Sequence, residues 1–141
     1  MHCTSEDDLS FFCITENLPD DFTPSKEVVW ADEASANFSS NDVHWTHNYK
    51  TLFRRGVLAT ISCGPVWFTP MTMSQPHSHG GSSGTVEEIW FSLTDGVSSL
   101  LGKELRPFNF GTAYKVPSDN RTPHANINLS NKAIKVFWFM N

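Results

Sequence analysis

The chain has 141 residues and a mass of 15.9 kDa, which is the size of one domain with one hydrophobic core. Hydrophobic residues make up 39% of the sequence and aromatic residues 13%, whereas the 18% of charged residues is too few for long solvated helices. The net charge of −5, with no cluster of Lys and Arg, excludes nucleic acid as the expected partner, because phosphate contacts need clustered positive side chains.

The first 48 residues are expected to form an irregular N-terminal arm with an edge strand. Residues 1–26 are acidic and contain several Pro and Asp residues. Lys26–Trp30 is a short strand candidate, and residues 32–42 have too few apolar positions to anchor an element. We expect the barrel itself to span residues 49–141.

From Tyr49 onward, short apolar runs alternate with Gly-, Pro-, Asn- and Asp-containing turns. The strands expected from this pattern are 49–54, 56–62, 65–73, 75–79, 87–93, 97–102, 112–116, 122–129 and 132–140. No window of 11 or more residues has a convincing period of 3.6, so helix should be scarce. Many short strands with regular turns predict an all-β sandwich, jelly roll or barrel.

The first group of candidate functional residues is His77-Ser78-His79, followed by a Gly/Ser loop and then Glu87-Glu88. Side chains two apart in a strand point to the same face, so the two histidines would present their imidazoles together. The loop would turn the chain back, which allows a carboxylate at the start of the next strand to complete a metal site. The spacing leaves open whether that carboxylate belongs to Glu87 or to Glu88.

The second group lies in the expected strand 122–129. Its polar and apolar residues alternate in the opposite sense to a strand whose polar face is exposed to water. His124, Asn126 and Asn128 share one face, and the apolar residues Ala125, Ile127 and Leu129 share the other. If the apolar face packs against protein, the polar face looks into a wet cavity or at solvent. In a small barrel such a face is where a ligand or a metal is bound.

Together these two groups resemble the paired motifs of the cupin superfamily, whose members fold as a double-stranded β-helix, or jelly-roll barrel. His77 and His79 match the His-x-His of the first motif, and Gly111, Pro117, His124 and Asn128 match the second. The first motif departs from the family in a longer loop before Glu88 and one extra residue before Gly96. The second departs in a gap from Pro117 to His124 that is two residues longer, and in Asn120, which lies roughly where the family has a turn Gly. Asn tolerates the left-handed conformation, so this last departure is mild. The resemblance implies Glu88 as the ligand, since it directly precedes an Ile-aromatic run.

The resemblance therefore implies one divalent transition metal on three imidazoles and one carboxylate: His77, His79, Glu88 and His124. This ligand set suits Fe(II), Mn(II), Ni(II), Zn(II) or Cu(II), and the sequence does not choose among them. By strand parity, a substrate pocket next to the metal would be lined by Met73, Gln75, Trp90, Tyr114, Asn126 and Asn128. In the competing interpretation, Trp90 and the methionines only fill the barrel.

Two functions are compatible with this pattern. The first is an enzyme that acts on a small oxygenated substrate, such as a sugar or sugar acid, with Glu87 or Tyr114 among the few candidates for a general base. The second is a non-catalytic module that binds a carbohydrate or metabolite, as the poor inventory of acid–base residues would predict. The resemblance further implies a homodimer.

No apolar run approaches the ~20 residues of a membrane span, and no signal-peptide pattern begins the chain. The N-terminus is acidic instead, with Glu6, Asp7 and Asp8 in succession. We therefore expect a cytoplasmic protein with no membrane partner, while a mature form whose leader had been removed would read the same.

Overall fold

The computed structural model describes residues 15, 17–24, 38–39, 47–57, 59–80 and 86–141, and within them it is all-β. The strands are β1 (Phe38–Ser39), β2 (His47–Lys50), β3 (Ser62–Phe68), β4 (Thr72–Met73), β5 (Glu88–Ser92), β6 (Val97–Leu101), β7 (Glu104–Phe108), β8 (Ala113–Val116), β9 (His124–Asn128) and β10 (Ile134–Met140). The strand expected at Lys26–Trp30 and most of the N-terminal arm lie outside the described residues. A domain boundary at residue 49 stays a prediction. No helix that could cross a membrane is found in the described part of the chain.

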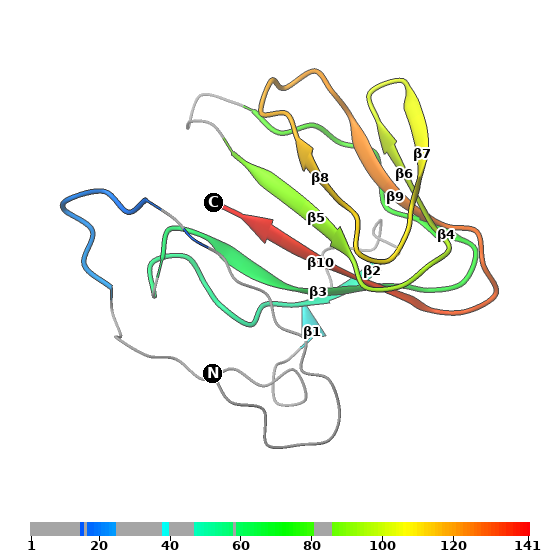
Figure 1. Cartoon of the computed structure of the whole chain (residues 1–141), viewed down its shortest axis with the longest axis horizontal. Helices are drawn as coiled ribbons and strands as arrows, with labels where there is room; N and C mark the ends of the chain where they lie inside the picture. Colours follow the sequence, from blue (N-terminus) through cyan, green and yellow to red (C-terminus); the bar gives the residue numbers. More distant parts are fainter. Residues whose placement is uncertain (1–14, 16, 25–37, 40–46, 58, 81–85) are drawn as a thin grey trace.

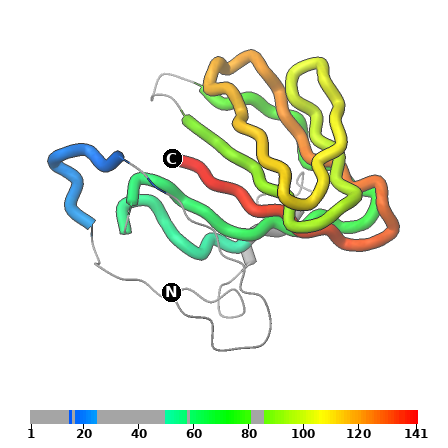
Figure 2. The backbone as a smooth tube through the Cα atoms, viewed as in Figure 1, coloured from blue at the N-terminus to red at the C-terminus, as the bar shows by residue number. Residues whose placement is uncertain are grey.

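The strands form two antiparallel sheets that face each other (Figure 1). The larger sheet has the order β1-β2-β3-β10-β5-β8, and the smaller has the order β4-β9-β6-β7. The two longest strands, β3 and β10, pair along their whole length, and β10 also pairs with β5 (Figure 2). The expected all-β jelly-roll architecture is confirmed.

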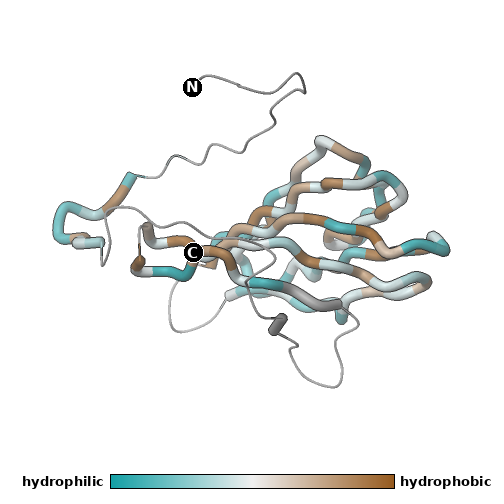
Figure 3. The backbone as a smooth tube through the Cα atoms, turned by 90° about the horizontal axis from the view of Figure 1, so that it is seen from below, coloured by the Kyte–Doolittle hydropathy of each residue, from teal (hydrophilic) through white to brown (hydrophobic). Residues whose placement is uncertain are grey.

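The apolar core fills the space between the sheets because alternate residues of each strand point inward. In β10 the buried residues are Ile134, Val136 and Trp138, and the residues between them are partly exposed. The core cluster takes residues from both sheets, namely Val66, Phe68, Trp90, Val97, Phe108, Val116, Ile134, Val136 and Trp138. Figure 3 shows the resulting mixture of hydrophobic and hydrophilic positions along the strands.

Strand β9 has the inverted alternation that the sequence predicts. His124, Asn126 and Asn128 are fully buried and face the interior, while Leu129 just beyond the strand is 64% exposed. The polar face of this strand therefore lies inside the barrel. Buried polar groups need partners, so this face must be satisfied by hydrogen bonds or by a ligand.

Several expected strand boundaries are wrong. Residues 55–57 form a turn and β3 begins only at Ser62, so the described residues of the expected strand 56–62 before Ser62 are not in a strand. The expected strand 65–73 is divided between the two sheets. The division falls near Met71, whose φ of 56° is left-handed. Strand β7 was not expected because it contains Pro107. β7 is the edge strand of the smaller sheet. Proline has no backbone N–H, and an edge strand tolerates this because no neighbouring strand needs that donor on its unpaired side.

The expected strand 75–79 is reduced to one bridge between His77 and His124, and an extra residue precedes that bridge. Met73 pairs with Ile127, and His77 pairs with His124. The chain therefore advances four residues from Met73 to His77 but only three between the partners Ile127 and His124. One extra residue on one strand defines a β-bulge, which reverses the sheet face of the side chains before it. The parity argument that placed Met73 and Gln75 on the face of the histidines is therefore wrong.

Asn128 holds together two turns at the end of the barrel opposite the histidines. Its Nδ2 donates to the carbonyl oxygens of Phe68, Thr69 and Lys132 at 2.7–3.1 Å. Its Oδ1 accepts from the backbone N and the hydroxyl of Ser130. The amide is thus occupied by structural contacts, and the structure gives it no free donor for a substrate.

We expect Asn128→Leu to lower the free energy of unfolding by about 1–3 kcal/mol, because it leaves buried carbonyl groups without their donor. Urea unfolding followed by tryptophan fluorescence would measure the change. Asn131→Leu is the matched control, since Asn131 is exposed in the neighbouring turn, and it should stay within about 0.5 kcal/mol of the wild type. Equal stability of both variants would contradict the structural role of Asn128.

Candidate metal centre

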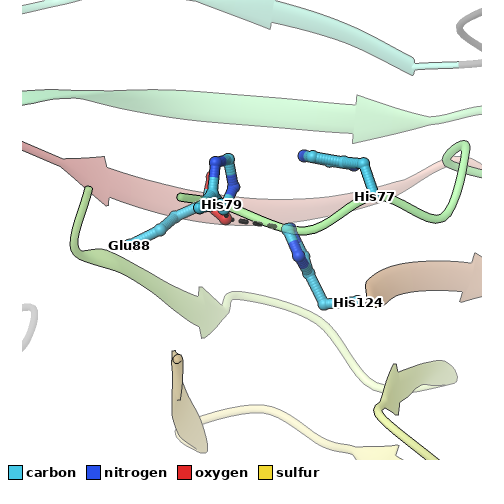
Figure 4. A group of neighbouring side chains, drawn as sticks. All are labelled: His77, His79, Glu88 and His124. Atoms are coloured by element: carbon cyan, nitrogen blue, oxygen red, sulfur yellow. Dashed lines mark hydrogen bonds and ion pairs between the residues drawn. The ribbon is translucent and has the colours of Figure 1, made fainter. Parts of the chain in front are cut away.

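Four side chains from three parts of the chain meet inside the barrel (Figure 4). His77 and His79 come from the segment after β4, Glu88 begins β5, and His124 begins β9. One donor atom from each of them lies within 4.8 Å of all the others. The structure therefore brings together all four residues predicted as metal ligands.

Glu88 is the centre of the direct contacts. Its Oε2 lies 3.0 Å from Nε2 of His79 and 2.9 Å from Nε2 of His124. His77 completes the group through its ring, whose centroid is 4.3 Å from that of His124 and 4.9 Å from that of His79. Glu88 and His124 are buried, and the other two histidines are partly exposed.

The carboxylate is held in its charged form. Burial alone would raise the pKa of Glu88, but hydrogen bonds to His124 and His79 outweigh burial and lower the pKa to about 2. Glu87, one residue earlier, points the other way and pairs with Lys115 in an exposed position. Of the two alternatives left open by the sequence, Glu88 is therefore the one that lies in the cluster.

His77 has its ring orientation set by the backbone. Its Nδ1 lies 2.9 Å from the carbonyl oxygen of Gln75, and a carbonyl can only accept, so Nδ1 carries the proton in this contact. Burial lowers the pKa of His77, which favours the neutral imidazole. Neutral His77 with a protonated Nδ1 keeps the Nε2 lone pair for a metal, which is the usual arrangement of a histidine ligand.

A backbone hydrogen bond from Asn120 also positions His79. Its carbonyl oxygen accepts from the backbone N of Asn120 at 2.8 Å. A Cβ on Gly80 would lie only 2.5 Å from the Cβ of Asn120, so glycine is required for this close approach. Asn120 has a φ of 53°, which confirms that it takes the left-handed position expected of a turn glycine.

The donor set fits a divalent transition metal. The buried His124 has Glu88 as the partner of its Nε2, and its Nδ1 has no hydrogen-bond partner within the described residues, so this imidazole lacks part of the compensation that a buried polar group needs. Metal–ligand bonds of about 2.0–2.2 Å place two ligands at most about 4.4 Å apart, close to the spacing found here. Three imidazoles and one carboxylate suit Fe, Mn, Ni, Zn or Cu, and exclude a typical calcium site, which needs oxygen ligands.

Three of the predicted pocket residues, Trp90, Tyr114 and Asn126, also lie inside the barrel near the cluster. The Trp90 ring is buried, with its centroid 6.4 Å from that of His124. Asn126 is fully buried, and its Oδ1 accepts from Ser99 Oγ at 2.5 Å and from Tyr114 Oη at 3.0 Å. Asn126 Nδ2 has no acceptor among the described residues, whereas the N–H of Trp90 is one of the groups that lower the pKa of Glu88.

The remaining predicted residues are not brought to the cluster. Met73 is 42% exposed on the face opposite to Asn128, and the side chain of Gln75 is exposed while its carbonyl holds His77. Glu87 and Asn128 have the other partners described above. Sequence reasoning missed Ser99, which pairs with Asn126 across the sheet, and the only available signal was its inward parity with Val97.

Solved structures support the identification of the fold. No protein-family model matches the sequence, and no curated protein matches it. A sugar phosphate isomerase of the cupin superfamily from Silicibacter pomeroyi is similar at a TM-score of 0.66, with 12% identity over 80% of this chain and 75% of its own. KdgF from a Halomonas species gives 0.61, with 17% identity over 80% of this chain and 93% of its own.

An RmlC-like cupin from Shewanella frigidimarina gives a TM-score of 0.60, with 10% identity over 79% of this chain and 87% of its own. At such identities the similarity is one of fold, and it agrees with the two facing antiparallel sheets described above. The chain therefore has the cupin fold, a jelly-roll barrel in which three histidines and one glutamate converge on a site that could hold a metal ion.

Proposed function

We propose that this protein is a mononuclear metal enzyme of the cupin fold that acts on a small oxygenated substrate such as a sugar or sugar acid. The observation that carries the proposal is the convergence of His77, His79, Glu88 and His124 within 4.8 Å. A buried carboxylate surrounded by three imidazoles is costly to build and has a clear use as a metal site.

The bound metal would act as a Lewis acid that polarises a substrate oxygen or activates a water. The residues around the ligands would hold them in position. The Gln75 carbonyl keeps His77 in the tautomer that leaves Nε2 as a ligand. The backbone hydrogen bond from Asn120 to the His79 carbonyl keeps His79 in place. The barrel walls, with Trp90 beside His124, exclude bulk water from the ligand cluster.

The substrate class follows from an unpaired donor on the strand that carries His124. Asn126 Nδ2 is a buried N–H group without a protein acceptor in the described part of the chain. It favours a ligand that offers oxygen acceptors, such as hydroxyl, carbonyl or carboxylate groups. The Silicibacter relative in fold is described as a sugar phosphate isomerase, which is consistent with an oxygen-rich substrate.

A second function, a non-catalytic module that binds a carbohydrate or metabolite, is favoured by two observations. Glu87, the acid–base candidate closest in sequence, is exposed and paired with Lys115. Burial raises the pKa of Tyr114 far above its usual value, so its hydroxyl stays protonated and does not act as a base at neutral pH. Catalysis would then depend on a metal-bound base.

The homodimer and the cytoplasmic location expected from the sequence also remain proposals. The described strands account for a complete pair of facing sheets within one chain. Sedimentation at micromolar concentration would test the dimer, and a monomeric mass would contradict it.

We expect untagged protein, after reconstitution with Fe, Mn, Ni, Cu or Zn, to hold close to one ion per chain by inductively coupled plasma mass spectrometry. Glu88→Ala and His124→Ala should lose it, because each removes a ligand rather than a supporting contact. The loss in affinity should exceed the about 10–100-fold typical of changes around the ligands.

Glu87→Ala is the matched control, since Glu87 is the adjacent carboxylate and lies outside the cluster. It should bind the metal like the wild type. Circular dichroism of each variant separates loss of the site from loss of the fold. Full metal content in Glu88→Ala with an intact fold would refute the assignment.

We expect the metal-loaded protein to bind sugar acids, and Trp90→Phe to weaken that binding about tenfold, since it removes one N–H donor and keeps an aromatic ring. Isothermal titration with a panel of aldonic and uronic acids would measure the affinity. Trp67→Phe is the control, because Trp67 alternates with the inward Val66 and Phe68 and points out of the barrel. Equal effects of both replacements would contradict the role of Trp90.

A further inference from the structure

The outer side of the smaller sheet, which faces away from the larger sheet, is an apolar surface (Figure 1). Side chains alternate along each strand, so the residues between the inward ones point outward. The outward residues of the four strands are Met73 of β4, Ala125 and Ile127 of β9, Ser98 and Leu100 of β6, and Leu105 and Pro107 of β7. All but the serine are apolar, and none of them is charged.

Several of these apolar side chains are in contact with solvent. Leu105 is 59% exposed and Met73 is 42% exposed. Leu129 continues the same outward face just beyond the end of β9, and it is 64% exposed. Single exposed apolar residues are common, but a continuous apolar patch on a protein surface marks a site of interaction. This face therefore has the character of a surface that another molecule covers.

The centre of the face is a block of alternating large and small side chains. Ile127 of β9 pairs with Ser98 of β6, and two residues further along these strands Ala125 pairs with Leu100. Each large side chain therefore has a small one as its neighbour, both along its own strand and across to the next. Ala125 is fully buried although it points outward, so it forms the floor of a hollow between larger residues.

The block is complementary in shape to a second copy of itself. A two-fold axis in the plane of the interface, through the middle of the block, places the two large side chains of one copy over the two small ones of the other. An interface of this kind uses the same patch on both partners. Large side chains that fill facing hollows give the close packing found at the centre of stable interfaces.

Charge also favours the smaller sheet for pairing with itself. The chain has a net charge of −5, so two copies attract each other only where no like charges meet. The outward residues of the larger sheet include Lys115 and Lys135, which a pairing of two such faces would bring into the contact. The centres of interfaces are depleted in charged residues, and the outward face of the smaller sheet meets that condition.

We propose that the outer face of the smaller sheet is the interface between two copies of this chain, related by a two-fold axis. The partner is a second copy because the patch is uncharged and its central block fits itself. The interface does not depend on the metal, since His124 points inward from β9 whereas Ala125 and Ile127 point outward. The homodimer thus has a defined surface, and each barrel keeps its own ligand cluster.

Sedimentation equilibrium of the 141-residue chain at micromolar concentration tests the proposal. The wild type should have twice the mass of one chain. Leu100→Glu should weaken the dimer at least about 100-fold, because it places two like charges at the centre of an apolar interface. Ile89→Glu is the matched control: Ile89 is 41% exposed on the outer side of the larger sheet, and its replacement should leave the dimer unchanged.

A monomeric wild type would overturn the proposal. So would a dimer that persists in Leu100→Glu, or one that is lost in Ile89→Glu instead. Leu105→Glu repeats the test at a side chain that is already largely exposed, where a charge does not disturb the core. Both leucine variants should keep the circular dichroism and the metal content of the wild type, so that a loss of the dimer is distinguished from a loss of the fold or of the metal site.

A mixture of two variants tests the two-fold symmetry. Leu100→Glu and Leu100→Lys should each be monomeric, because each places like charges together. In the proposed interface the two copies of residue 100 are neighbours across the axis, so equal amounts of the two variants should restore a dimer that contains one of each. Folded variants that stay monomeric when mixed would overturn the two-fold arrangement.

Discussion

The two backbone hydrogen bonds between His77 and His124 are the contact on which the candidate metal centre depends. The N–H of each residue donates to the carbonyl of the other, at 3.2 and 2.8 Å. They join the segment after β4 to the start of β9 and bring the two imidazoles to a centroid distance of 4.3 Å. The extra residue before His77 is what allows this contact while Met73 keeps its own register, because a bulge re-aims the side chains beyond it. Without it, strand parity would turn the histidines away from the barrel.

Burial of a carboxylate is the principal energetic difficulty of this site. An isolated charge in the interior is strongly unfavourable, and Glu88 is tolerated because two imidazole nitrogens lie within 3.0 Å of its Oε2. The apolar core packs close to this carboxylate, because Val116 of β8 is the cross-strand partner of Glu88 and Trp138 lies on the neighbouring strand β10. The polar site and the hydrophobic stabilisation therefore share one interior.

The fold class and the histidine positions could be predicted because their signals are local. His77-x-His79 and the inverted alternation around His124 depend on a period of two, whereas the choice of Glu88 over Glu87 depended on the resemblance to the cupin motif. The outward positions of Met73 and Gln75 could not be predicted, because one inserted residue reverses the parity of the strand and leaves no compositional mark. Asn128 could not be distinguished from Asn126 for a related reason. Both face inward, and only the tertiary positions of Phe68, Thr69 and Lys132 show that the amide of Asn128 is fully used.

Asn126 is the polar residue that extends the ligand cluster along the inward face of β9. It lies two residues from His124, and its Oδ1 accepts hydrogen bonds from the hydroxyls of Ser99 and Tyr114. Its backbone N donates to Ser74 Oγ at 2.9 Å, and β9 is paired on both sides, with β4 and β6. The main chain is thus fixed while the amide nitrogen has no acceptor among the described residues. A side chain with a fixed backbone and one unmet donor can bind an acceptor without a movement of the strand.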